Sequence, residues 1–123
     1  MQRGISSPCF DLILLGVGSD GHTASLFPGD PALQEKRRWA APVLAPADYS
    51  IGKRITLTLA AINSAANVIF IASGSEKRMA LKAILEDTAS AGSFYPASMI
   101  HPADKTIWFV DEKTCPKNQL NII

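Results

Sequence analysis

Two residues that can exchange protons lie in a glycine-rich stretch near the start of the chain. Asp20 and His22 are part of the run GVGSDGH, which begins at residue 16. An imidazole can accept a proton near neutral pH, and glycines let the backbone approach an oxyanion or a sugar closely. The spacing therefore predicts a site for a phosphorylated sugar, with Asp20 and His22 beside a binding turn formed by Gly16, Gly18 and Gly21.

The turn needs an element to position it, and the residues before it predict a strand. Residues Phe10–Leu15 are mostly apolar and are followed at once by Gly16, as in a strand buried on both faces. After the turn, residues His22–Phe27 predict a short helix that Pro28 ends, because proline lacks an amide proton. A binding turn at the carboxyl end of a strand is typical of an α/β sheet.

The rest of the chain alternates between strand and helix patterns. We expect an edge strand within Gln34–Pro46, strands at Lys53–Thr58, Val68–Ala72 and Thr106–Val110, helices at Leu59–Ala66 and Glu76–Glu86, a loop at Asp87–Ser93, an irregular segment at Tyr95–His101 and a mobile tail at Lys113–Ile123. The Ser73–Ser75 turn is expected to cap the second helix, whose apolar face includes Met79 and Leu81. The fold class is α/β, with three layers, a mostly parallel sheet and flanking helices in a single domain over residues 1–123.

Composition excludes several classes of protein. The chain has 123 residues, 47% of them hydrophobic, and a formal net charge of +1, so neither nucleic acid nor an anionic membrane is an expected partner. No apolar run is long enough to cross a bilayer. The two cysteines lie far apart in sequence, which favours a reduced, cytoplasmic setting. The two histidines and the two distant cysteines show no metal-ligand spacing, so no metal is expected.

The run from Gly16 to Gly21 formally fits the dinucleotide-binding pattern G-x-G-x-x-G. That reading requires a full helix after the third glycine and a carboxylate at the end of the next strand. Here Pro28 interrupts the helix, and the region where the carboxylate belongs reads WAAPVLAP. A nicotinamide or flavin site is therefore disfavoured.

The segment GVGSDGHTASLFPG, from Gly16 to Gly29, resembles the signature of the 6-phosphogluconolactonases. The related glucosamine-6-phosphate deaminases share the glycine turn and the Asp-Gly-His but continue with an Asn-Glu-Pro pattern. Further resemblance extends from Arg54 to Leu85 and through YPASMIHPADKTIWFVDEKT. The resemblance implies a Rossmann-like fold of the glucosamine-6-phosphate isomerase type and hydrolysis of 6-phosphogluconolactone, without a cofactor.

In such a lactonase His22 would be the base that activates water, and amides of the glycine turn are candidate oxyanion donors. Asp20 would either orient the imidazole or only close an Asx-turn. For the phosphate of the substrate, the resemblance points to Lys77 at the start of a helix, with Arg54 as a second candidate. His101 is expected to be structural or exposed, and Ser25 lacks the context of a nucleophile.

Members of the resembled family are about twice as long. Their N-terminal half carries a Ser-Gly-Gly-Ser phosphate loop and an Asp-Glu-Arg motif, and neither occurs here. We therefore expect the chain to correspond to the C-terminal half of such a domain. A sheet cut in half exposes an unpaired edge and an apolar face, so self-association or pairing with the N-terminal half is expected. The alternatives are a deaminase-like enzyme and a non-catalytic phosphate-binding half-fold.

Overall fold

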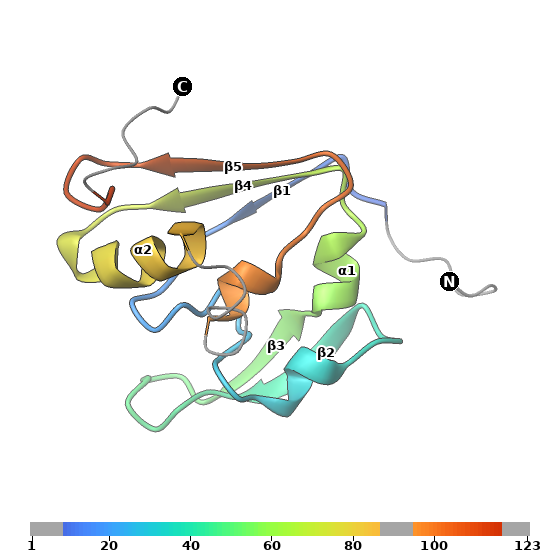
Figure 1. The fold of residues 1–123 in the computed structure, drawn as a ribbon. Helices are drawn as coiled ribbons and strands as arrows, with labels where there is room; N and C mark the ends of the chain where they lie inside the picture. Colours follow the sequence, from blue (N-terminus) through green and yellow to red (C-terminus); the bar gives the residue numbers. More distant parts are fainter. Residues whose placement is uncertain (1–8, 87–94, 117–123) are drawn as a thin grey trace.

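The fold is that of a computed structural model, which describes residues 9–86 and 95–116. Its centre is a parallel sheet of three strands in the order β1 (Leu12–Leu15), β4 (Asn67–Ala72) and β5 (Lys105–Val110). Leu12 pairs with Asn67 and Leu15 with Phe70, while β5 pairs with β4 along its whole length. In Figure 1 the three strands run side by side, and the labelled helices both lie below them. The expected parallel α/β arrangement is confirmed.

The two faces of this sheet differ in burial. Ile13, Leu15, Val68 and Phe70 point to the covered face and join the main apolar core, where Phe70 stacks on Trp108 with ring centroids 4.0 Å apart. The opposite face leaves large apolar side chains in solvent: Leu12, Leu14, Ile71 and Phe109. The prediction that the first strand is buried on both faces is therefore wrong for the part of the chain that the structure describes. A covering layer for that face is missing from these residues.

Each of the two α-helices follows a strand, as the sequence pattern predicts. Helix α1 (Leu59–Asn63) begins at Thr58, whose hydroxyl accepts a hydrogen bond from the amide of Ala61. Its apolar residues Leu59 and Ile62 are buried. The helix is shorter than the expected Leu59–Ala66 because it ends at Ser64, whose hydroxyl bonds back to the carbonyl of Ala61.

The second helix begins differently from its prediction. A 3-10 turn η2 (Ser75–Lys77) leads into α2 (Arg78–Glu86), and no side chain caps η2 because its N-cap residue is Gly74, with φ of 111°. The expected serine cap is therefore wrong. Helix α2 buries Ala80, Leu81 and Ile84, but Met79 is 82% exposed and does not belong to the apolar face that the spacing predicted.

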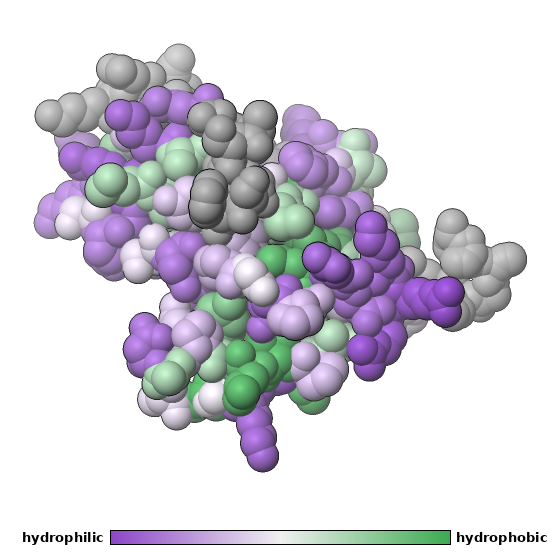
Figure 2. Space-filling view, turned by 60° about the horizontal axis from the view of Figure 1, so that its bottom comes forward, coloured by the Kyte–Doolittle hydropathy of each residue, from purple (hydrophilic) through white to green (hydrophobic). Residues whose placement is uncertain are grey.

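A two-stranded antiparallel sheet lies at the opposite end of the molecule from the parallel sheet (Figure 1). It consists of β2 (Ala40–Leu44) and β3 (Lys53–Leu57), with Ala40 paired to Leu57. Figure 2, which brings this end of the molecule forward, shows hydrophobic residues among hydrophilic ones, and Leu44 and Ile55 of the two strands are exposed. The 3-10 turn η1 (Pro31–Gln34) precedes it. The predicted edge strand is thus confirmed as one strand of a hairpin.

The C-terminal part of the described chain is more ordered than its sequence suggests. The segment expected to be irregular contains the 3-10 turn η3 (Pro96–Met99). Thr114 is fully buried and donates a hydrogen bond to the carbonyl of Gly74 at 3.0 Å, so the tail predicted to be mobile is packed at its beginning. The predicted loop at Asp87–Ser93 and the remainder of the tail lie outside the described residues.

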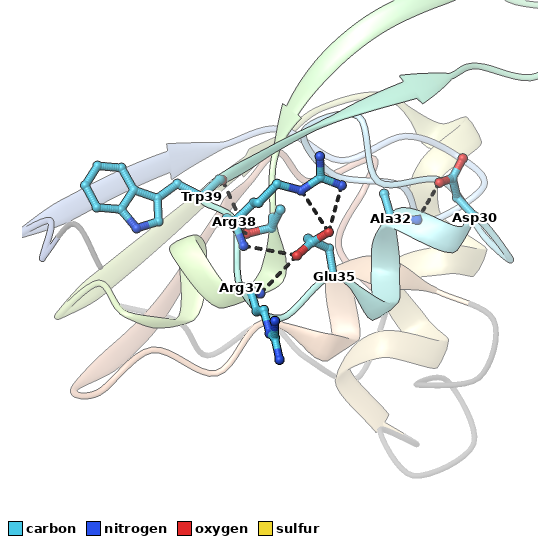
Figure 3. Close-up of polar contacts among 7 residues, drawn as sticks. Asp30, Ala32, Glu35, Arg37, Arg38 and Trp39 are labelled. Atoms are coloured by element: carbon cyan, nitrogen blue, oxygen red, sulfur yellow. Dashed lines mark hydrogen bonds and ion pairs between the residues drawn. The ribbon is translucent and has the colours of Figure 1, made fainter. Parts of the chain in front are cut away.

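A carboxylate holds the turn that leads into the hairpin (Figure 3). Glu35 accepts hydrogen bonds from the amides of Arg37 and Arg38, each at 3.0 Å, and from the guanidinium of Arg38 at 2.9 and 3.1 Å. The Arg37 amide, the Arg38 amide and the Arg38 side chain lower the pKa of Glu35 from 4.5 to about 2. The ionised form of Glu35 is therefore favoured by the folded chain.

Replacing Glu35 should make stability less sensitive to acid. Because the pKa of Glu35 is lowered on folding, its contribution is fully present above pH 4.5 and is lost as the pH falls toward about 2. The melting temperature of Glu35→Gln is expected to be lower than that of the original chain at neutral pH, with the difference narrowing across this range. Arg37→Ala is the control, since only the backbone amide of Arg37 bonds to Glu35. A difference in melting temperature that does not change with pH would contradict the lowered pKa of Glu35.

Candidate functional site

The glycine turn leaves the carboxyl end of β1 as a tight loop closed by its own backbone. The amide of Gly18 donates to the carbonyl of His22, and the amide of Gly21 donates to the carbonyl of Gly18, both at 2.9 Å. The expected short helix after His22 is wrong. Instead the chain makes a bridge between Thr23 and Leu26 around Ala24, which has φ of 52° in the left-handed region. The turn buries Leu26 fully and so anchors the loop to the core.

Asp20 and His22 form a hydrogen-bonded pair on this turn. The Oδ1 atom of Asp20 lies 2.6 Å from Nδ1 of His22 and also accepts the backbone amide of His22 at 3.1 Å. Burial by itself would raise the pKa of Asp20, but the hydrogen bonds from His22 outweigh it and leave that pKa below its usual value. An ionised carboxylate only accepts hydrogen bonds, so Nδ1 carries the proton and Nε2 is the acceptor nitrogen.

This pair is partly open to solvent. The side chain of His22 is 18% exposed and that of Asp20 is 35% exposed. Phe27 packs against the imidazole with centroids 4.7 Å apart and fixes the plane of the ring. The arrangement orients the imidazole and leaves it partly exposed to solvent, which are two requirements of general-base chemistry.

Tyr49 completes the cluster, and no sequence pattern points to it. Its hydroxyl donates to Oδ2 of Asp20 at 3.1 Å and lies 3.2 Å from Nδ1 of His22. Burial, followed by the charge of Asp20, raises the pKa of Tyr49. The residue lies in the loop between β2 and β3, and its contacts span 27 and 29 residues, so no local spacing could have shown them.

The structure brings one of the two predicted phosphate-binding cations to the same cluster. The guanidinium carbon of Arg54 lies 5.3 Å from the ring centre of Tyr49 and 5.5 Å from that of Phe27, within the range of cation–π contact. The Nε atom of Arg54 donates to the carbonyl of Ile51 at 2.9 Å. The guanidinium of Arg54 is therefore held against the two rings that contact the imidazole of His22.

Lys77 reaches the same edge of the sheet by a different route. Because β1 and β4 are parallel neighbours, the turns that follow them leave the sheet on the same side. Lys77 lies in the turn after β4, where its backbone amide donates to Gly74 at 3.1 Å. Within the described residues no hydrogen bond or ion pair joins its side chain to Asp20, His22 or Arg54. Its binding role stays a prediction.

The three glycines of the turn have different surroundings. A Cβ atom at Gly18 would overlap the imidazole of His22 and approach Oδ1 of Asp20 to 2.8 Å, whereas one at Gly16 would meet nothing within 4 Å. Gly21 has φ of 82° and lies against the ring of Tyr95. Since the amides of Gly18 and Gly21 already donate within the turn, the oxyanion role expected of them does not fit the structure. Gly18 leaves space for the Asp20–His22 pair, and Gly21 leaves space for the ring of Tyr95.

Ser25 and His101 are each held by a hydrogen bond from the backbone amide. The amide of Ser25 donates to the hydroxyl of Thr56 at 3.0 Å, which ties the signature turn to β3. His101 is exposed, and its backbone amide donates to Oδ1 of Asn63 at 2.6 Å, consistent with the structural or exposed position expected for it. His101 takes no part in the cluster around His22.

The described residues contain no group of three or more histidine, cysteine, aspartate or glutamate side chains that could hold a metal ion. They also contain no helix of the length and apolarity needed to cross a membrane.

A parallel α/β sheet with a carboxylate–imidazole pair at the end of its first strand is typical of α/β proteins that bind a ligand at the carboxyl edge of the sheet. The sequence model described as "Glucosamine-6-phosphate isomerases/6-phosphogluconolactonase" matches residues 1–118. The chain therefore belongs to this family. The resemblance seen in the sequence is confirmed.

Individual relatives agree with this assignment. The chain is 48% identical to the 6-phosphogluconolactonase of Rattus norvegicus over 89% of its own length, and 46% identical over 90% to the "Probable 6-phosphogluconolactonase 1" of Arabidopsis thaliana. The solved 6-phosphogluconolactonase of Trypanosoma brucei superposes with a TM-score of 0.73 at 34% identity over 87% of this chain. The chain covers 42% of each of the two curated relatives and 41% of the solved one. It thus spans less than half of their length.

Gly18 and Gly16 provide a matched pair of substitutions. Gly18→Ala forces a methyl group into the imidazole of His22, so its free energy of unfolding should fall by about 1–3 kcal/mol, as for other overpacked sites. Gly16→Ala meets no atom and should be close to neutral. Chemical denaturation of both variants measures the difference, and equal stability of the two would contradict the close contact at Gly18.

Proposed function

We propose that this chain carries the general base and part of the phosphate-binding site of an enzyme that hydrolyses 6-phosphogluconolactone to 6-phosphogluconate. The observation that carries the proposal is the 2.6 Å contact between Asp20 and Nδ1 of His22, which leaves Nε2 as an acceptor on a partly exposed ring. The family and the names of the relatives supply the substrate class.

The reaction needs a water molecule made nucleophilic and a place for the negative charge that develops on the lactone oxygen. In this proposal Nε2 of His22 takes a proton from the attacking water, and the ionised carboxylate of Asp20 stabilises the imidazolium that forms. Asp20 therefore orients the base instead of merely closing a turn. Arg54, and Lys77 at the same sheet edge, bind the phosphate of the substrate and hold the lactone beside the base.

Loss of the imidazole should remove most of the hydrolysis. In a preparation that contains this chain together with the remainder of the domain, His22→Ala is expected to lower kcat for the lactone by a factor of about 10²–10⁴, the usual contribution of a general base. His101→Ala is the matched control, because that histidine is exposed and lies outside the cluster. Unchanged hydrolysis by the His22 variant would reject the proposed base.

The family description also names the glucosamine-6-phosphate isomerases, so a second activity requires a test in the same preparation. Ammonia release from glucosamine-6-phosphate would favour the deaminase class, and its absence alongside active lactone hydrolysis would remove that class. The signature from Ala24 to Gly29, which lacks the Asn-Glu-Pro pattern, favours the lactonase.

The exposed side of the parallel sheet bears on how this activity is assembled. Leu14 is 59% exposed, Ile71 55% and Phe109 50%, and β1 has a strand partner on one edge only among the described residues. A contiguous apolar face and an open strand edge favour association. We propose that a polypeptide corresponding to the other part of the relatives' domain covers this face, and that the chain by itself self-associates through it.

A charged residue on that face should weaken the self-association. In sedimentation experiments on the isolated chain, Ile71→Lys is expected to shift the distribution toward monomer, because the lysine places a charge in the centre of the apolar face. Met79→Lys is the matched control, since Met79 is 82% exposed but lies on helix α2. A monodisperse monomer with a cooperative melt in the unmodified chain would contradict the proposal.

A further inference from the structure

The β2–β3 hairpin contributes Tyr49 to the site, and the proposed reaction assigns no role to the hydroxyl group of this residue. Tyr49 lies in the loop between β2 and β3, and the loop is closed by the amide of Ala45 donating to the carbonyl of Gly52 at 2.7 Å. The amide of Tyr49 donates to the carbonyl of Pro46 at 3.0 Å, which fixes the backbone of the tyrosine within the loop. The side chain is only partly exposed and turns toward the glycine turn.

The hydroxyl group of Tyr49 contacts both Asp20 and His22, and both contacts favour the same tautomer of His22. It donates its single proton to Oδ2 of Asp20 at 3.1 Å, and its oxygen lies 3.2 Å from Nδ1 of His22, where it can be a second acceptor for the proton that Nδ1 donates to Oδ1 of Asp20. The first contact holds the carboxylate of Asp20 in the orientation in which its Oδ1 accepts a hydrogen bond from Nδ1 of His22. The second favours a protonated Nδ1 directly. Both contacts therefore favour the tautomer in which Nε2 is free to act as a base.

The aromatic ring of Tyr49 has a separate contact with the predicted phosphate-binding cation. It meets the imidazole edge-on with centroids 5.5 Å apart, and the guanidinium of Arg54 lies over its face at 5.3 Å. Phe27 already packs on the imidazole at 4.7 Å and on the Tyr49 ring at 5.0 Å, so the ring position is supported without the hydroxyl. The hydroxyl is thus not needed for packing, and its two polar contacts are what distinguish tyrosine from phenylalanine here.

We propose that Tyr49 is a positioning residue that sets the tautomer of His22 by holding Asp20, while its ring supports Arg54. This inference rests on the proposed function for its consequence in catalysis, but the tautomer itself can be measured without any activity. The charged groups that face the cluster are Asp20, Arg54 and the neighbouring Asp48. Burial and the charge of Asp20 keep the pKa of Tyr49 raised, so the hydroxyl remains a donor across the range in which histidine titrates.

The test compares Tyr49→Phe with the original chain by the ¹⁵N chemical shifts of the His22 ring, at a pH where imidazole is neutral and tyrosine is protonated. The original chain is expected to show Nδ1 protonated. The variant should raise the ratio of the Nε2–H to the Nδ1–H tautomer about fivefold, which is the effect of one ordinary hydrogen bond. An unchanged ratio in a variant that still melts cooperatively would overturn the proposal.

Tyr95→Phe is the matched control, because Tyr95 packs on Gly21 of the same turn but has no hydrogen bond from its hydroxyl within the described residues. A tautomer change of the same size in this control would assign the effect to general loosening of the turn and would also overturn the proposal. In a preparation that hydrolyses the lactone, Tyr49→Phe should lower kcat about fivefold and leave KM within about twofold. If no preparation hydrolyses the lactone, the proposed function fails while the tautomer measurement still decides the role of Tyr49.

Discussion

The parallel pairing of β1 with β4 is the constraint on which the rest of the site depends. It forces the chain to leave both strands at the same edge, so the glycine turn and the turn that carries Lys77 are brought to one side of the sheet although they lie more than 50 residues apart in sequence. The pairing also selects which residues of β1 point into the core. Ile13 and Leu15 are buried by it, and the turn that begins at Gly16 is thereby placed over the covered face.

The Asp20–His22 pair depends mainly on residues that are close to one another in sequence. Asp20, His22 and Gly18 lie within five residues, and the pair fits because position 18 has no side chain. The remaining members of the cluster come from the hairpin, which contributes Tyr49 and Arg54 from the far side. A short loop motif thus supplies the carboxylate and the imidazole, and a distant element supplies the tyrosine and the guanidinium that lie beside them.

Much of this could be predicted from the sequence, and the failures have physical causes. Strands β4 and β5 and the two helices follow apolar patterns that local periodicity reveals, and the Asp20–His22 pair follows from a spacing of two residues. The exposure of one face of β1 could not be predicted, because Leu12 and Leu14 are as apolar as buried residues. A sequence pattern cannot show that the layer that would cover them is missing from the described residues. The helix predicted at His22–Phe27 does not form, and the left-handed backbone of Ala24 could not be predicted because alanine rarely adopts that conformation. Tyr49 was missed because its partners are set by tertiary structure alone.

The hydrogen bond between the Ser25 amide and the Thr56 hydroxyl has a mechanical consequence. Thr56 belongs to the same strand as Arg54, and its hydroxyl also donates to the carbonyl of Leu57 at 2.8 Å, so the signature turn is attached to the backbone of β3. The hairpin cannot tilt away from the sheet without straining this link. In the proposed site, an anion held by the guanidinium of Arg54 would therefore be connected through β3 to the loop that bears the imidazole of His22.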